Sequence, residues 1–478
     1  MFTAIAGYYF KRQVYSRRLH VLAAAALCTM VLNAIAATSY IQQENRTFQT
    51  IARQAQAENT IERVFVPRPV NSFVFVDHGT PQHLPPYLIV TPWAMDVPIE
   101  TFGASRNSYF MSLDFRSIFL LVFLMASLLI SYDSVSGERD ANRLRMLLCQ
   151  PLSPVRLVLA AAVVCALILL AIVGLSLSLN LLLVTASGAI RFSPELIGRY
   201  AWAFAFIGSG SLIGVAVGCM LSSLCKSTWK SLIGVLAFWI AFVLVLPIAT
   251  ALSAAIANPP PSIYELETKI RRAQMMLYER VGSISSTQIT DILNQNLSPR
   301  DANEKILSLE SAEVANNLRE LEKFKKEVTQ YRADFLKQAE AADRLRKNLN
   351  LLSPFETAIR GLDASFTTGD SFEEEFEDAV ARYVTAFSPS SQRLQQQWFQ
   401  GALQFGPSIR ESGYTIRQVL WVDYRAVPKP ILAQLPQFSF QIGAADTPQA
   451  AFLLLVVCSH LAVCLLLLVA AARGVRVE

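Results

Sequence analysis

Residues 157–184 read LVLAAAVVCALILLAIVGLSLSLNLLLV, a run of 28 residues that contains no charged side chain. A helix of about 20 apolar residues crosses the hydrocarbon core of a bilayer, so this run is long enough to span a membrane. Similar runs lie on either side of it, and the six candidate spans are 19–38, 115–132, 157–184, 200–224, 229–256 and 449–472. The sequence therefore predicts an all-α polytopic membrane protein with six transmembrane helices.

The composition agrees with a membrane protein. Of the 478 residues, 53% are hydrophobic and only 17% are charged, which is a low charged fraction for a soluble protein. The net charge of +5 is small for this length and does not indicate a nucleic-acid partner. The seven cysteines lie in apolar runs or short loops. They predict no disulfide framework, and no pair has the spacing of a zinc site.

The positions of the basic residues predict the orientation of the chain, because cytoplasmic ends of membrane helices are rich in Lys and Arg. With the N-terminus inside, the basic residues at the inner ends are Lys11, Arg12, Arg17, Arg18, Arg139, Arg143, Arg145, Arg156, Lys226, Lys230, Arg473 and Arg476. The one short outer loop, 188–199, has Arg191 and Arg199. Both termini are therefore predicted in the cytoplasm, with polar segments 41–113 and 257–448 outside.

The two ends of the chain fit this topology. Residues 1–18 predict an amphipathic helix on the inner membrane surface, because apolar and aromatic residues stand beside Lys11 and Arg12. The first span follows within 19–40, and 449–478 holds the sixth span and a short cytoplasmic tail. An alternative for the first span is a cleavable signal peptide ending near Ala34-Ile35-Ala36, which would leave the other five spans unchanged.

The segment 41–113 predicts a small mixed module on the outer side. Val64-Phe65-Val66 and Phe73-Val74-Phe75-Val76 are typical of short strands, and many prolines interrupt what surrounds them. His78 and His83 lack a convincing set of metal partners, so surface histidines are favoured over a metal site.

The segment 257–448 predicts a large, mainly helical domain that contains a helical hairpin over 262–352. The long arm places apolar residues on heptad a and d positions, and these are Val314, Leu321, Phe324, Val328, Tyr331, Phe335, Ala342, Leu345, Leu349 and Leu352. The first arm repeats the spacing with Ile263, Leu266, Ile270, Ala273 and Leu277. A compact bundle of several shorter helices is the alternative. A further amphipathic helix is predicted from Asp370 to Ser388-Pro389.

The loop between the second and third spans carries the most specific motif. Residues 132–156 read YDSVSGERDANRLRMLLCQPLSPVR. This segment closely resembles the corresponding segment of the permeases of type-2 ABC transporters. There, an Asp and a Ser-Gly-Glu-Arg precede a short Leu-rich helix, and a Pro stands before the next span. In that family the segment lies on the inner surface and contacts the ATPase. The resemblance implies that the ATPase-coupling residues are Asp133, Ser136, Gly137, Glu138, Arg139, Asp140, Arg143, Leu144, Arg145, Leu147 and Leu148.

The spacing inside this loop predicts an amphipathic coupling helix. Its charged residues would face the cytoplasm, and these are Glu138, Arg139, Asp140, Arg143 and Arg145, with Leu144, Leu147 and Leu148 toward the bilayer. The resembled family commonly has Gly-Thr where this chain has Asn142-Arg143. Because that glycine would interrupt a helix, the helix here is predicted to be continuous over 136–149. An ordinary positively charged inner loop is the alternative reading.

A second resemblance concerns the outer segments. Asn107, Leu113-Asp114-Phe115, Ser353-Pro354-Phe355 and Asp423-Tyr424-Arg425 resemble the subgroup of these permeases with large extracytoplasmic domains. That subgroup includes permeases linked to nitrous-oxide-reductase maturation and to gliding. The resemblance implies a bacterial inner-membrane protein with a small mixed outer module after the first span and a large helical outer domain between the fifth and sixth.

The sequence contains no Gly-rich loop that ends in Gly-Lys-Ser or Gly-Lys-Thr, so it predicts no nucleotide site in this chain. No catalytic, metal or cofactor-binding residues are predicted, and the chain is not expected to be an enzyme. The resemblance implies that ATP and Mg²⁺ are bound by a separate ABC ATPase subunit. It also implies a second permease subunit that forms a homodimer, and contact with membrane lipid. A periplasmic or outer-envelope protein is a further candidate partner.

Polar and small residues inside the spans give further candidates. Gly210, Gly214 and Gly218 recur every four residues, which lets two membrane helices approach closely. Packing within one subunit is favoured over a seam between subunits. His460 and Asn180 are candidates for an intramembrane polar site, because polar groups are costly in lipid and usually face the protein interior. A structural role for His460 is favoured over one in translocation or proton transfer.

Two functions are compatible with these observations, and a third is weaker. The first is the permease subunit of an ATP-driven exporter, moved by a separate ATPase. The second is a mechanical or scaffolding complex, in which the same ATPase moves the outer domain to act on an envelope partner without transport. A membrane sensor is disfavoured, since no signalling domain follows the last span.

Overall fold

A computed structural model of the chain describes residues 2–59, 64–77, 87–90, 95–96, 113–149, 153–259, 261–280, 291–292, 294–295, 297, 299–401, 409–411, 414–416, 434–440 and 445–475. His78, His83, Asn107, the motif at 423–425 and Arg476, all named above, lie outside these residues.

The membrane region has the predicted six spans. Within the described residues, six helices are long and apolar enough to cross a bilayer, which confirms a mostly helical polytopic membrane protein. The first is the long helix α2 (Arg17–Glu58), and the second is α3 (Phe115–Ile118), the π-helical turn η3 (Phe119–Phe123) and α4 (Leu124–Ser131). The others are α7 (Pro154–Ala186), α8 (Pro194–Leu224), the fifth span of α9 (Thr228–Ile240), η4 (Ala241–Val245) and α10 (Leu246–Ala257), and α17 (Thr447–Arg473).

Serine–proline pairs fix where two of these spans begin. Ser153 caps α7 by accepting a hydrogen bond from the backbone N–H of Arg156, and Ser193 caps α8 in the same way. A proline follows each cap at the first helical position, where its missing N–H costs nothing. The fourth span therefore starts at Pro194, six residues before the start predicted at residue 200.

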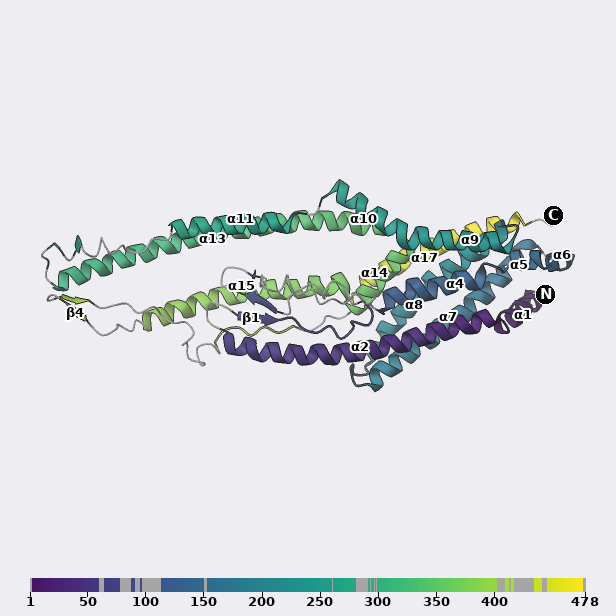
Figure 1. The fold of residues 1–478 in the computed structure, drawn as a ribbon, viewed down its shortest axis with the longest axis horizontal. Helices are drawn as coiled ribbons and strands as arrows, with labels where there is room; N and C mark the ends of the chain where they lie inside the picture. The colour runs from purple at the N-terminus through teal and green to yellow at the C-terminus, as the bar shows by residue number, and fades with distance from the viewer. Residues whose placement is uncertain are drawn as a thin grey trace.

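Helix α2 extends well beyond the membrane boundary predicted near residue 40 and continues to Glu58. A small antiparallel sheet follows, formed by β1 (Val64–Pro67), β2 (Tyr87–Val90) and β3 (Met95–Asp96). Val64 pairs with Val90 in its register. In Figure 1, β1 lies between α2 and α15.

The apolar run from Phe73 to Val76 is not a strand, in contrast to the prediction. Residues 72–76 form turns, and Val74, Phe75 and Val76 are buried. The ring of Phe75 packs against Phe115, Tyr200 and Phe366, which come from three different helices. The run is apolar because it fills the core at the end of the span bundle that is farther from the two termini, and the alternation expected of a half-exposed strand does not apply.

The predicted hairpin consists of α11 (Ile263–Arg280) and α13 (Pro299–Asn350), which lie side by side in Figure 1. Helix α13 is uninterrupted over 52 residues, so it is about 78 Å long. Ala273 of α11 and Val328 of α13 are buried, as their seam positions predict. Leu352 lies beyond the end of α13 and is 63% exposed, so it is not part of the seam.

The end of α13 nearest the membrane is reinforced by ion pairs within one helical turn. Lys347 and Arg346 each approach a carboxylate oxygen of Asp343 at 2.7 Å. Burial raises the pKa of the Asp343 carboxyl, but hydrogen bonds from Lys347 and Arg346 lower it by more, so the net pKa lies below its usual value. At the far end of the first arm, Arg280 of α11 contacts Glu320 of α13 across the hairpin at 3.5 Å.

Two more helices connect the hairpin to the last span. Helix α14 (Pro354–Phe366) is buried along most of its length and packs against α8 and α17. A Cβ at Gly361 would overlap the ring of Phe206 on α8, so this crossing requires glycine. Helix α15 (Gly369–Gly401) follows, and β4 (Ile409–Glu411) pairs with β5 (Tyr414–Ile416) in a separate small sheet.

Helix α15 does not end at Ser388-Pro389 as predicted. It continues through Pro389, although an interior proline removes one backbone hydrogen bond and crowds the preceding turn. Phe387 and Leu394 are seven residues apart, and both are buried in the cluster that covers β1 and β2. This continuous apolar face explains why tertiary packing overrides the helix-breaking tendency of the proline.

Candidate functional site

The loop predicted to couple to an ATPase lies at the end of the molecule where both termini are found (Figure 1). It contains two short helices, α5 (Ser136–Asp140) and α6 (Arg143–Leu148), in place of the continuous helix predicted over 136–149. The break is at Asn142, whose φ of 56° is left-handed. Asparagine adopts this conformation more readily than most residues. Asn142 therefore supplies the left-handed residue that separates α5 from α6.

Glu138 lies inside the protein, in contrast to the prediction that it faces the cytoplasm. Its side chain is 0% exposed. Arg12 Nη1 of α1 (Phe2–Val14) lies 2.6 Å from its carboxylate, and Arg143 Nε of α6 lies 2.9 Å from it. Tyr8 also donates its hydroxyl to Glu138. Burial and the charge of Glu138 raise the pKa of the Tyr8 phenol above its usual value.

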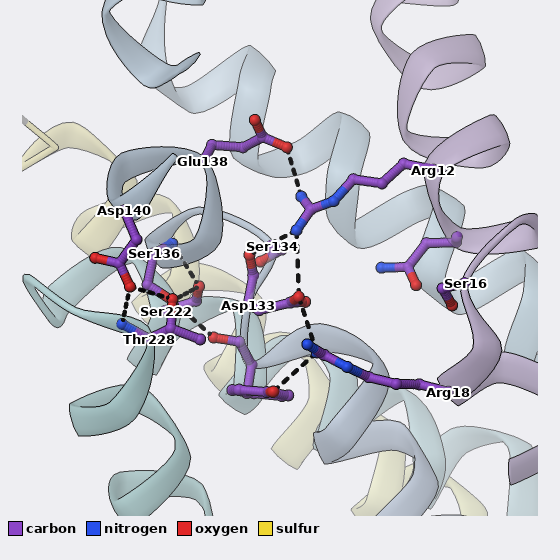
Figure 2. Close-up of polar contacts among 12 residues, drawn as sticks. Arg12, Ser16, Arg18, Asp133, Ser134, Ser136, Glu138, Asp140, Ser222 and Thr228 are labelled. Atoms are coloured by element: carbon purple, nitrogen blue, oxygen red, sulfur yellow. Dashed lines mark hydrogen bonds and ion pairs between the residues drawn. The ribbon is translucent and has the colours of Figure 1, made fainter. Parts of the chain in front are cut away.

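Asp133 is the second carboxylate that holds the N-terminal segment to this loop (Figure 2). Arg12 Nη2 lies 3.2 Å from its carboxylate, and Arg18 Nη1 lies 3.0 Å from the same oxygen. Arg18 also donates a hydrogen bond to the Tyr132 hydroxyl at 2.8 Å. Arg12 therefore bridges Asp133 and Glu138, and a Cβ at Gly137 would lie only 3.0 Å from its guanidinium.

Helix α1 is packed onto the protein in addition to carrying these arginines. Ile5, Tyr9 and Gln13 are buried, at the spacing of one helix face. Gln13 donates a hydrogen bond to the carbonyl of Ile130 at 3.1 Å. The helix predicted to lie on the membrane surface is thus attached by one face to the spans.

The start of α5 is attached to α8 through Ser222. The hydroxyl oxygen of Ser222 accepts hydrogen bonds from the backbone N–H groups of Val135 and Ser136, both at 3.0 Å. These donors are unpaired at a helix start, so a serine from another helix serves here as the N-terminal cap. Ser134 contacts Cys219 on the same face of α8.

The end of α5 is attached to the junction of α8 and α9. Arg139 Nη1 donates a hydrogen bond to the carbonyl of Cys225 at 2.6 Å. Asp140 accepts hydrogen bonds from the backbone N–H of Thr228 at 2.8 Å and from its hydroxyl at 2.5 Å (Figure 2). Thr228 is the first residue of α9, so Asp140 acts as the cap of the fifth span.

The exposed residues of the loop include Asp140, Ala141 and Asn142, where α5 ends and α6 begins, and three residues of α6. Met146 is 72% exposed, Arg145 is exposed, and half of the Arg143 side chain is exposed despite its contact with Glu138. Leu144 is buried, and Leu147 is partly buried on the opposite side. The side chain of Leu148 lies outside the described residues.

The residues that sequence reasoning missed come from distant segments. The sequence patterns assign Arg12 and Arg18 only to topology and surface binding, and they give no specific role to Tyr8, Ser222 or Thr228. The sequence does contain one indication of these contacts, because basic residues precede the first span and acidic residues follow the second. That signal does not specify which carboxylate each arginine contacts.

The glycine repeat lies at the crossing of α8 with the second span. A Cβ at Gly210 would lie 2.5 Å from the ring of Phe119, and one at Gly214 or Gly218 would overlap Ser127 or Ser131. The close approach made by these glycines is therefore within the chain.

Asn180 and His460 do not form a shared polar site. Asn180 donates hydrogen bonds to the carbonyl of Met30 and to Asn33, and it accepts one from the Tyr200 hydroxyl at 2.7 Å. This network joins α7 to α2 and α8 inside the bundle. His460 instead contacts the carbonyl of Val456, one turn earlier in its own helix, at 2.8 Å.

Comparison with known proteins agrees with this architecture. The sequence model described as ABC-2 family transporter protein matches residues 3–472, a range that includes all six spans and the segments between them. A comparison with individual curated proteins found no match. The match across almost the whole chain shows that this multi-pass membrane protein belongs to the ABC-2 family of transporter proteins.

Proposed function

We propose that the chain is the permease subunit of an ATP-driven ABC exporter, and that the inner loop receives the movement of a separate ATPase subunit. The observation that carries this proposal is the attachment of α5. Within five residues, it contacts α1 through Glu138, α8 through Ser136 and α9 through Asp140. A force applied to the loop would thus reach three membrane elements through short, charged or capping contacts.

The exposure of each side chain favours some of the implied coupling residues over others as the proposed ATPase contact. The implied coupling set includes Glu138, which is buried, and Arg139, which is only partly exposed. Asp140 is exposed and caps α9. The exposed face of α6 includes Arg145 and Met146. An exposed Met beside Arg is typical of protein interfaces, in which both residue types are enriched. We therefore assign docking to α6 and force transfer to α5.

Copurification with the ATPase tests this division of roles. Met146→Glu places a charge in the proposed contact and should weaken association about tenfold or more. A tenfold loss corresponds to about 1.4 kcal/mol of binding free energy. Tyr15→Glu is the matched control, because it introduces the same charge at a neutral position that is 83% exposed. Both variants should insert normally. Unchanged copurification of the ATPase with Met146→Glu would refute docking on α6.

The proposal includes the orientation and partners of the chain. Both termini would lie in the cytoplasm of a bacterial inner membrane, with α2, the small sheets and the hairpin outside. ATP and Mg²⁺ would be bound by the ATPase, and a second permease subunit would complete a homodimer. Single cysteines at Gln43 and Lys326 should react with an impermeant thiol reagent in intact spheroplasts, whereas one at Arg145 should react only after lysis.

A mechanical complex is the second candidate, and two observations favour it. The outer end of the bundle is filled by aromatic rings, including Phe75, Phe115 and Phe366. The hairpin also extends far beyond the spans, in the same direction as α2 but along the opposite edge of the molecule (Figure 1). Deleting 283–345 with a short Gly linker should preserve insertion and ATPase binding but abolish function. Full complementation by that variant would refute a mechanical output.

A further inference from the structure

The second and fifth spans are joined by hydrogen bonds at two positions along their length. Beyond the cap that α5 provides to α9, Ser231 donates its hydroxyl to the carbonyl of Tyr132 at 2.7 Å. Further along the same two spans, the indole N–H of Trp239 donates to the carbonyl of Leu120 at 3.0 Å. Two side chains of the fifth span thus contact the backbone of the second at separate levels.

Each of these two spans contains a π-helical turn, and no other described span does. Such turns are rare and mark places where a helix bends. In the fifth span, η4 precedes Pro247, whose ring and missing N–H explain the widened turn. In the second span, η3 contains neither Pro nor Gly, so its cause is tertiary. Its first residue, Phe119, is the ring that packs closely over Gly210.

The two π-helical turns meet at one side chain from the outer domain. Phe355, near the start of α14, is 1% exposed. Its ring lies 6.3 Å from the rings of Phe119 in η3, Phe242 in η4 and Phe238 one turn before η4. Rings at this separation and with steep interplanar angles pack edge to face. Phe355 is therefore inserted between the two turns.

Phe355 is also firmly connected to the hairpin. Helix α14 begins directly after α13 ends, and Arg360 of α14 donates a hydrogen bond to the carbonyl of Lys347 at 2.7 Å. Asn350, the last residue of α13, accepts a hydrogen bond from the Thr250 hydroxyl of α10 at 3.0 Å. The base of the hairpin is thus held both to α14 and to the outer half of the fifth span.

We propose that the second and fifth spans bend together at η3 and η4, and that Phe355 transmits this bend to the outer hairpin. This inference rests on the proposed function, because the inner loop would supply the motion by holding the inner ends of the same two spans. Trp239 and Phe355 are positioning residues in this device. Neither contacts the ATPase-docking surface on α6.

Hydrogen exchange of the intact complex, with and without ATP and vanadate, tests the proposal. In the wild type, nucleotide should change exchange in the inner loop, in both π-helical turns and in α13. Trp239→Phe removes the indole donor but keeps an aromatic ring, and Phe355→Leu keeps an apolar side chain. In both variants the response of the inner loop should remain, and the response of α13 should be lost. Trp229→Phe is the matched control, since Trp229 is 69% exposed in the same span.

The outcomes separate this inference from the proposed function. An α13 response that persists at wild-type size in Trp239→Phe and Phe355→Leu would overturn the inference and leave the proposed function standing. A wild-type complex whose inner loop responds while α13 does not would overturn it equally. If no ATPase copurifies with the wild type, both proposals fail. Trp239→Phe is the milder change, so it also decides the case in which Phe355→Leu does not fold.

Discussion

The contact between Arg12 and Glu138 leads to a quantitative prediction about the N-terminal helix. Helix α1 has 13 residues, and helices of this length are marginally stable in isolation. It is therefore ordered by its buried face and by Arg12, which bridges Glu138 and Asp133. Arg12→Ala removes both ion pairs, and we expect α1 to open more often while the spans remain folded.

The expected size follows from the geometry. A hydrogen bond to a charged group contributes about 1.5–3 kcal/mol, and Arg12 makes one short contact at 2.6 Å and one longer contact at 3.2 Å. Arg143 and Arg18 still neutralise the two carboxylates, and Arg12 itself is 21% exposed, which reduces the cost. We expect a local loss of about 2–4 kcal/mol, which overlaps only the lower part of the roughly 3–5 kcal/mol typical when a buried charge loses its partner.

Hydrogen exchange within residues 2–14 measures this loss directly. At about 1.4 kcal/mol per factor of ten, amide exchange in α1 should accelerate roughly 30- to 1,000-fold in Arg12→Ala. Lys11→Ala is the matched control, because Lys11 lies on the same helix and is exposed. An acceleration below about threefold, or an equal acceleration in both variants, would show that the ion pairs do not hold α1 in place.

Three further predictions concern the spans and the hairpin. Gly214→Ala should cost about 1–3 kcal/mol by overpacking and lower the unfolding midpoint in detergent, whereas Gly198→Ala in the same helix, with open space around it, should not. Asn180→Leu should cost about 2–3 kcal/mol by leaving buried partners unpaired, and a loss no larger than that of His460→Leu would contradict the network. Because the folded pKa of Asp343 is lowered, its contacts stabilise the base of α13 above the unfolded pKa of about 3.9 and are lost as pH falls through the lowered value. Asp343→Asn should therefore remove the part of the acid-induced increase in exchange at 340–350 that occurs below about pH 4, and an unchanged acid profile would count against this assignment.

Patterns that depend on neighbouring residues predicted the membrane architecture well. Apolar runs of sufficient length specified six spans, because a bilayer demands continuous hydrophobicity over a fixed distance. Serine and proline marked helix starts such as Ser153, since capping is a contact between residues three apart. The spacing of Gly210, Gly214 and Gly218 indicated a close helix crossing, although it did not identify the second span as the partner.

Only the tertiary structure decided which polar groups of the loop between the second and third spans are buried inside the protein. Glu138 and Arg139 look equally exposed in the sequence, yet Glu138 is buried because Arg12, 126 residues away, approaches it when α1 packs onto the spans. The same holds for Pro389, which remains inside a helix because the apolar face on both sides of it is covered. Sequence periodicity records which face of an element is apolar, and it carries no information about which distant segment covers that face. The ion pairs, caps and ring contacts that define the candidate site were therefore determined by packing between segments far apart in the chain.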